Sequence, residues 1–228
     1  MKYIVFIVAL FFYVPCLAQQ TSYAEWKKKA ETQINLRPEY GNVTKTKEQI
    51  GLDNEFIETV LKQDTTRIKG SEHLVKLGFT YLYRGDLETA MKRFNQAWLL
   101  NSQNENAYWG YAAVYFRFDD RDEAKRQLDK GLSINPNSSN ILTDEATISM
   151  SFYMDSGNKT ELNKAIALFN QSYKIDPKNQ NTLFKLSTAY YYSKDCVNAL
   201  KYYNECMKLG GQQISPGYGD ALKKMCNK

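Results

Sequence analysis

The chain has 228 residues, of which 43% are hydrophobic and 24% charged, with a formal net charge of +5. Because acidic and basic residues are balanced along the chain, no block is basic enough to hold a polyanion, which disfavours nucleic acid and anionic membranes as partners. The single histidine, His73, has no cysteine near it in sequence, and neither metal-ligand spacing nor a Gly-rich phosphate loop is present. We therefore expect no catalytic residue, no metal and no cofactor.

Residues 1–18 have the pattern of a secretory signal peptide. Lys2 is followed by an apolar run over residues 4–14, and the triplet 16–18 has a small residue at each end. The run is shorter than the roughly 20 apolar residues that span a bilayer. The pattern predicts export, with cleavage after Ala18 and a mature protein that is periplasmic or secreted.

A lipid anchor on Cys16 is the alternative. In bacterial lipobox sequences a leucine stands three residues before the cysteine and a small residue directly before it. Tyr13 and Pro15 occupy these places here, so lipidation is disfavoured.

Residues 19–70 are expected to form an N-terminal helical extension. Residues 26–34 are compatible with a short helix, and residues 37–42 read as a turn. Apolar residues of the segment 47–61 recur on one helical face, which predicts an amphipathic helix that packs on the structure after it. We expect this extension to cap that structure.

From Ser71 onward the same pattern returns every 34 residues, first over 71–104 and then over 105–138. Large apolar residues stand at the fourth, seventh and eleventh places, a small residue at the eighth and alanine at the twentieth. Residues 180–213 repeat the pattern. The apolar places form one stripe at 3.6 residues per turn, which predicts two antiparallel helices per unit.

Small residues are expected where the two helices of a unit cross, as at Gly78 and Ala90. Phe94 is expected to fill the space against the following unit. Pro136 and Pro177 stand where a second helix has to end. Since one helix pair cannot bury its own apolar stripe, neighbouring pairs have to stack.

These residues resemble the tetratricopeptide repeat. The residues that carry the resemblance in the first unit are Leu74, Leu77-Gly78, Tyr81, Gly85-Asp86, Ala90, Phe94 and Ala97. The resemblance implies an all-α solenoid of antiparallel helix pairs. It divides residues 71–213 into four repeats: 71–104, 105–138, 139–179 and 180–213.

The third repeat is seven residues longer than the others. Two lengthened helices joined through residues 155–160, with Thr160 as N-cap, would absorb the excess. A partner-contacting loop is the alternative. Residues 214–228 are expected to form a C-terminal capping helix, because apolar residues between Tyr218 and Met225 share one face.

Three cysteines remain after the expected cleavage: Cys196, Cys206 and Cys226. The first two fall on one predicted helix about 15 Å apart, beyond the reach of a disulfide. A bond from Cys226 to either of them is therefore the only pairing open. We expect buried thiols rather than a disulfide, because free cysteines are commonly core residues.

The other face of each first helix is rich in aromatic residues. In the tetratricopeptide-repeat family this face lines a concave groove that takes extended peptides, so the resemblance implies a partner-binding site. Its candidate residues are Phe79, Tyr83, Trp109, Phe116, Arg117, Phe184, Tyr191 and Tyr192. The competing interpretation is that residues 19–70 or tight curvature already cover this face.

The expected function is that of a non-enzymatic adaptor of the cell envelope that binds a protein or peptide partner. Repeats that hold chaperone C-termini carry Lys and Asn where this chain has Val75, Phe79, Trp109 and Ala113, so that ligand class is disfavoured. A carbohydrate-binding accessory protein and a structural subunit of an envelope assembly are the alternatives.

Overall fold

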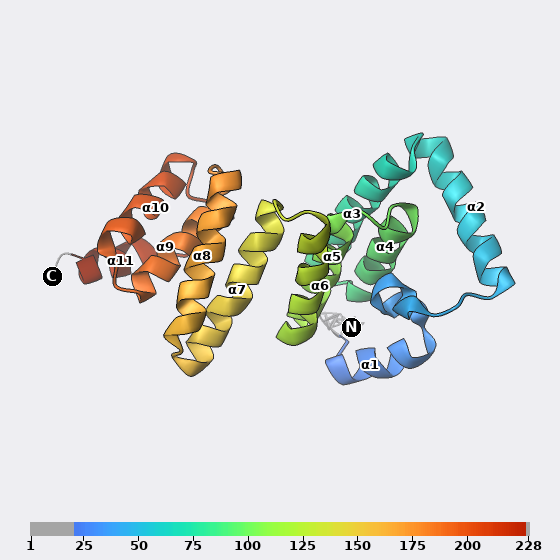
Figure 1. Ribbon diagram of the computed structural model, residues 1–228, viewed down its shortest axis with the longest axis horizontal. Coiled ribbons are helices and arrows are strands. Elements are labelled where there is room, and N and C mark those ends of the chain that lie inside the picture. Colours follow the sequence, from blue (N-terminus) through green and yellow to red (C-terminus); the bar gives the residue numbers. More distant parts are fainter. Residues whose placement is uncertain (1–20, 227–228) are drawn as a thin grey trace, which may run out of the picture.

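The computed structural model describes residues 21–226, and within this range every regular element is helical (Figure 1). This confirms the all-α class. The expected signal peptide lies outside the described residues. None of the described helices is long and apolar enough to cross a membrane. The α-helices are α1 Tyr23–Thr32, α2 Lys47–Asp64, α3 Arg67–Tyr83, α4 Leu87–Leu100, α5 Glu105–Arg117, α6 Arg121–Ile134, α7 Ser139–Ser156, α8 Lys159–Ile175, α9 Gln180–Tyr192, α10 Cys196–Lys208 and α11 Tyr218–Cys226.

Four helical hairpins form the body of the molecule: α3/α4, α5/α6, α7/α8 and α9/α10. They follow one another along the long axis, and each hairpin contacts its neighbours in the chain (Figure 1). This is the solenoid expected when each pair leaves an apolar stripe for the next one to cover. Helix α3 begins at Arg67, before the expected start at Ser71, because Thr66 caps it by accepting from the Lys69 N–H.

The turns inside the hairpins use the same local chemistry in three units. One residue adopts the left-handed conformation: Gly85, Asp119 or Lys194, with φ of 81°, 58° and 64°. The residue after it is an aspartate whose carboxylate accepts a backbone N–H of the second helix, which satisfies one of its unpaired donors. These aspartates are Asp86, Asp120 and Asp195.

Phe94 of α4 joins the first unit to the second. Its ring is fully buried and lies against Gly78 of α3 and Gly110 of α5. A Cβ atom at either glycine would stand only 2.4 Å or 2.3 Å from the ring. The small residue at position 78 thus makes room for Phe94, which fills the space between units as expected.

The longer third unit consists of longer helices. Helices α7 and α8 have 18 and 17 residues, and only Gly157 and Asn158 separate them. The expected N-cap at Thr160 is wrong. Asn158 caps α8 instead and accepts from the Thr160 N–H, because Gly157 adopts the left-handed conformation and ends α7 at Ser156.

Residues 21–42 form an N-terminal segment that packs on α4 and α6, the second helices of the first two units. Trp26 of α1 and Leu36 of the 3₁₀ turn Ile34–Leu36 are fully buried. The rings of Tyr23 and Trp26 lie 5.0 Å and 5.1 Å from Phe118, in the turn between α5 and α6. Glu39, in the second 3₁₀ turn Pro38–Asn42, pairs with Lys130 of α6 at 2.5 Å.

Asn95 of α4 holds this segment in place. The fully buried amide donates to the carbonyls of Asn35 and Arg37 at 2.9 Å each, and it accepts from the Tyr40 N–H and the Tyr111 hydroxyl. Burial raises the pKa of Tyr111 well above its usual value, so its hydroxyl stays a donor. All the hydrogen-bonding capacity of this amide is used.

At the other end, α11 packs on the fourth unit and a disulfide ties it to the start of α10. The bond joins Cys196 to Cys226, whose Cα atoms are 5.4 Å apart. The expectation that all three cysteines are thiols is therefore wrong for this pair, because the return of α11 onto the last hairpin brings them together. Cys206 is a buried thiol, as expected.

Candidate binding groove

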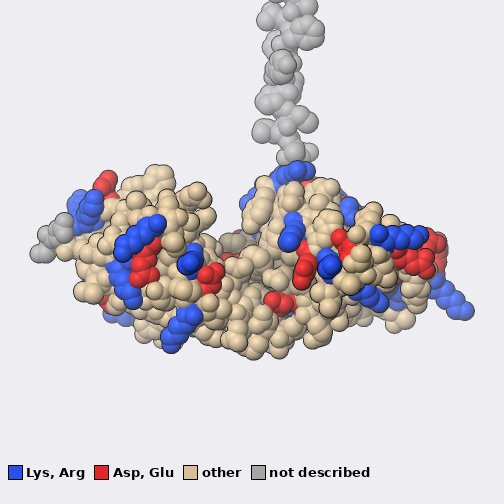
Figure 2. Space-filling model, turned by 90° about the horizontal axis from the view of Figure 1, so that it is seen from above, with Lys and Arg blue, Asp and Glu red and all other residues tan. Residues whose placement is uncertain are grey.

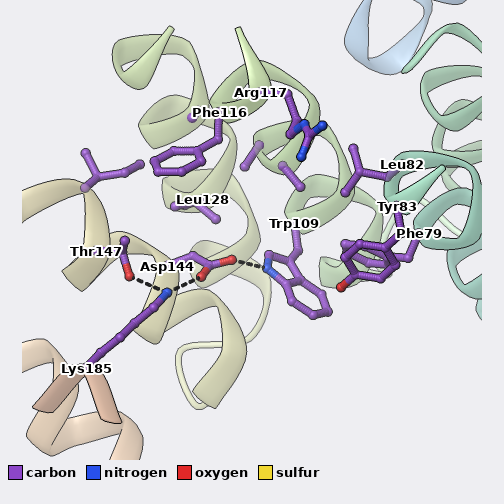
Figure 3. A pocket seen from close by; sticks show the side chains of 14 residues that line it. Phe79, Leu82, Tyr83, Trp109, Phe116, Arg117, Leu128, Asp144, Thr147 and Lys185 are labelled. Atoms are coloured by element: carbon purple, nitrogen blue, oxygen red, sulfur yellow. Dashed lines mark hydrogen bonds and ion pairs between the residues drawn. The ribbon is translucent and has the colours of Figure 1, made fainter. Parts of the chain in front are cut away.

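A pocket of about 210 Å³ opens on the side formed by the first helices of the units. Helices α3, α5, α7 and α9 contribute to its walls, and α6 contributes to its floor. Five of the eight candidate residues line it: Phe79, Tyr83, Trp109, Phe116 and Arg117 (Figure 3). Small residues at Ala112, Ala113 and Ala124 leave the space that these larger side chains enclose.

The aromatic side chains of two units meet in this pocket. The rings of Phe79 and Trp109 are 4.4 Å apart and inclined at 49°, and Tyr83 lies 6.2 Å from Phe79. Phe79 also contacts Phe94, edge to face at 5.2 Å. The inter-unit core therefore supports the pocket wall from behind.

A polar network closes the pocket on the side of the third unit. The indole N–H of Trp109 donates to the Asp144 carboxylate at 2.7 Å. Lys185 Nζ lies 3.6 Å from the same carboxylate and donates to Thr147 Oγ1 at 2.8 Å (Figure 3). The network fixes the orientation of the indole, and it compensates the charge of Asp144.

The most exposed of the candidate residues lie at the rim of the pocket. The Tyr83 side chain is 80% exposed and that of Phe116 45%. Arg117, next to Phe116, is also exposed. Large aromatic side chains that stay in water beside a preformed apolar pocket are typical of interaction surfaces.

The other three candidate residues form a separate cluster. Phe184 and Tyr191 pack against Tyr218 of α11, with ring centroids 5.4 Å and 6.0 Å away. Tyr192 contacts Tyr191 and, at 6.1 Å, Tyr153 of α7. None of them lines the pocket. The structure thus divides the predicted aromatic row into a part that lines the pocket and a part in which Tyr218 packs over Phe184 and Tyr191, while Tyr192 stays 37% exposed.

The cover predicted as an alternative does not come from residues 21–70, the described part of the N-terminal extension. They contact α3, α4, α6 and the α5–α6 turn, and contribute no residue to the pocket lining. The covering element is α11, at the other end of the molecule. Tyr218 stands 34 residues after Phe184, so α11 takes the place of the first helix of a further unit.

Sequence reasoning missed the polar side of the pocket, formed by Asp144, Thr147 and Lys185. The seven extra residues of the third unit shift its register, so that the 34-residue spacing alone does not assign its groove positions. A search for charged residues in the first helices of the third and fourth units would have found Asp144 and Lys185.

Charged side chains are scattered on the face shown in Figure 2, with both signs mixed and the surface hollowed between the two halves of the molecule. In the described part of the chain, no three His, Cys, Asp or Glu side chains gather as metal ligands would. His73 is exposed, and its Nδ1 lies 3.2 Å from Asp64. It lines none of the pocket described above.

Residues 81–143 match the family model described as tetratricopeptide repeat. Among solved structures, a thermophilic TPR protein of Thermus thermophilus, TTC0263, superposes with a TM-score of 0.56 at 14% identity, over 68% of this chain and 80% of that one. These findings support a tetratricopeptide-repeat protein.

Two further structures have the same fold. PilF of Pseudomonas aeruginosa gives a TM-score of 0.53 at 14% identity and covers 89% of each chain. A tetratricopeptide repeat protein from Parabacteroides merdae gives 0.51 at 20% identity, over 69% of this chain and 60% of that one. A comparison with curated proteins gives no match. At these identities the likeness concerns the fold, an all-α solenoid of the tetratricopeptide-repeat type.

Proposed function

We propose that this protein is an exported, non-enzymatic adaptor whose concave pocket binds an extended segment of a partner protein. The observation that carries the proposal is the apolar pocket walled by Phe79, Trp109 and Phe116, with Tyr83 exposed at its rim. A tetratricopeptide-repeat fold is in general an interaction module. A peptide in this pocket would bury aromatic surface that now faces water.

Export is supported by two independent features. The residues up to Ala18 have the composition of a signal peptide. The disulfide between Cys196 and Cys226 belongs in an oxidising compartment such as the periplasm or the extracellular space. Mass spectrometry of the protein purified from its own cells tests this: we expect an N-terminus at Gln19 and one disulfide. An intact N-terminus with reduced cysteines would refute it.

A peptide ligand suits the pocket better than a sugar. Carbohydrate faces stack on flat, accessible rings, whereas Phe79 and Trp109 are inclined at 49° and both are partly buried. The pocket of about 210 Å³ beside these rings has room for a single bulky side chain. Isothermal titration with glycans and with peptides separates the two classes.

Loss of partner capture in pocket variants tests the proposal. We expect Tyr83→Ala combined with Trp109→Ala to weaken capture at least roughly 10-fold, because buried aromatic anchors dominate interface energies. The control is Val197→Ala in α10, whose side chain is as exposed as that of Tyr83, at 80%. Circular dichroism has to show equal helicity. Capture that is unchanged in the double variant would refute the groove.

A further inference from the structure

A second depression adjoins the pocket and shares two residues with it. Tyr83 and Arg117 line both, and the depression continues over Arg84 and Lys92 toward the start of α4. A chain that leaves the pocket past Tyr83 therefore runs directly over this depression. Three basic side chains line this path: Arg84, Lys92 and Arg117.

The three cations beside this path have no carboxylate partner in the described part of the chain. Neither Arg84, Lys92 nor Arg117 forms an ion pair there, although the exposed residues Lys29 and Arg126 do. The two carboxylates in the depression are already engaged. Asp86 caps α4 at the Thr89 N–H, and Glu88 pairs with Lys29 at 2.5 Å.

The opposite end of the pocket offers no such charge. Asp144 faces Lys185 at 3.6 Å and accepts from the Trp109 indole at 2.7 Å, so both charges are compensated within the protein. The electrostatic field over the pocket is therefore asymmetric, neutral toward the third unit and positive toward the first. Arg117 and Arg84 are guanidinium groups, which bind carboxylates in a bidentate geometry.

Resting on the proposed function, we infer that the partner segment is an extended peptide with one bulky apolar side chain followed or preceded closely by a carboxylate. The apolar side chain enters the pocket between Trp109 and Phe116. The carboxylate binds Arg117, with Arg84 and Lys92 attracting it along the adjoining depression. This charge complementarity orients the peptide across α3 and α5, because only one end of the pocket attracts an anion.

Fluorescence anisotropy with labelled peptides tests the inference. The peptides carry one Phe in a Gly/Ser background, with Glu, Gln or Lys at one to four residues on either side, and an amidated C-terminus. We expect the best Glu peptide to bind roughly 10-fold tighter than its Gln counterpart, as for a hydrogen bond to a charged group. The advantage should shrink when ionic strength rises. A Gln peptide with a free C-terminal carboxylate distinguishes an acidic side chain from a chain terminus as the source.

Charge reversal completes the test. Arg117→Glu should abolish the preference for Glu and favour the Lys peptide, whereas Lys208→Glu, an exposed residue at the end of α10 with the same change in net charge, should leave the preference intact. Equal binding of Glu, Gln and Lys peptides that is still lost in Trp109→Ala would overturn the carboxylate inference alone. Absence of binding by every peptide would overturn it together with the proposed function.

Discussion

The two ends of the solenoid treat the same kind of surface differently. In the first two units, Phe79, Tyr83 and Trp109 surround an open pocket. In the fourth unit, Phe184 and Tyr191 lie under Tyr218 of α11. A row of aromatic residues at groove positions is therefore not by itself a binding site. Such a row can bind a ligand only where no following helix of the same chain occupies the place that the ligand would take.

The support behind each surface differs as well. The pocket rests on Phe94, wedged between Gly78 and Gly110, and on the N-terminal segment that Asn95 holds against α4. The covered cluster depends on α11, a helix of nine residues, and on the disulfide that anchors its last residue. A helix this short is not stable alone. The cover is therefore held by its packing on the last hairpin and by the disulfide, not by the stability of the helix itself.

The largest expected effect is that of removing the disulfide. Cys196→Ser combined with Cys226→Ser should lower the free energy of unfolding by roughly 3–4 kcal/mol, the entropy of closing a loop of about 30 residues. Chemical denaturation measures the loss, and the reduced natural protein should match the variant. Binding of the Phe/Glu peptide should stay unchanged. A parallel loss of peptide binding would show that the two ends are coupled.

The open end can be disturbed from behind with a single methyl group. Gly110→Ala would place a Cβ atom 2.3 Å from the Phe94 ring, and such overpacking costs about 1–3 kcal/mol. Because Phe94 contacts Phe79, peptide binding should weaken as well.

Gly51→Ala is the matched control for this substitution. Gly51 lies within α2, and a Cβ atom there meets nothing within 4 Å. Here the better helix propensity of alanine should raise stability by about 0.5–1 kcal/mol. Thermal unfolding followed by circular dichroism compares the two variants. Equal shifts in Tm would contradict the wedge.

A smaller effect is expected from the hydroxyl that closes the covered cluster. The hydroxyls of Tyr218 and Ser187 lie 2.8 Å apart, and Ser187 also bonds to the Ala199 carbonyl. Tyr218→Phe should therefore cost only about 0.5–1.5 kcal/mol, the net value of one hydrogen bond. Tyr192→Phe removes a hydroxyl from a side chain that is 37% exposed and should leave the Tm unchanged. A larger loss in the control would mean that Tyr192 is the closing residue.

The sequence is informative where structure is determined locally. The interval of 34 residues places Phe79 and Trp109 on the same face of successive first helices, and these two rings do meet. The packing of Phe94 between two units also follows from the spacing, because helix geometry repeats from unit to unit.

The features that the sequence did not predict depend on contacts between distant parts of the chain, which residue spacing does not reveal. The disulfide needs α11 to fold back on α10, and the irregular segment between residues 209 and 217 hides that return. The partnership of Asp144 with Trp109 joins residues of two units whose register changes at the longer third repeat. The cover over Phe184 has a signal in the sequence, since Tyr218 follows it at the repeat interval of 34 residues.

The most direct test places a photo-crosslinking amino acid at one position of each surface in the cells that make the protein. Phe116 at the pocket rim and Tyr192, the exposed residue beside the cluster under α11, are suitable, because their exposures are similar at 45% and 37%. The account predicts a discrete adduct from position 116 that disappears in Trp109→Ala, and none from position 192. An adduct from position 192 alone, or one from position 116 that persists in Trp109→Ala, would contradict it.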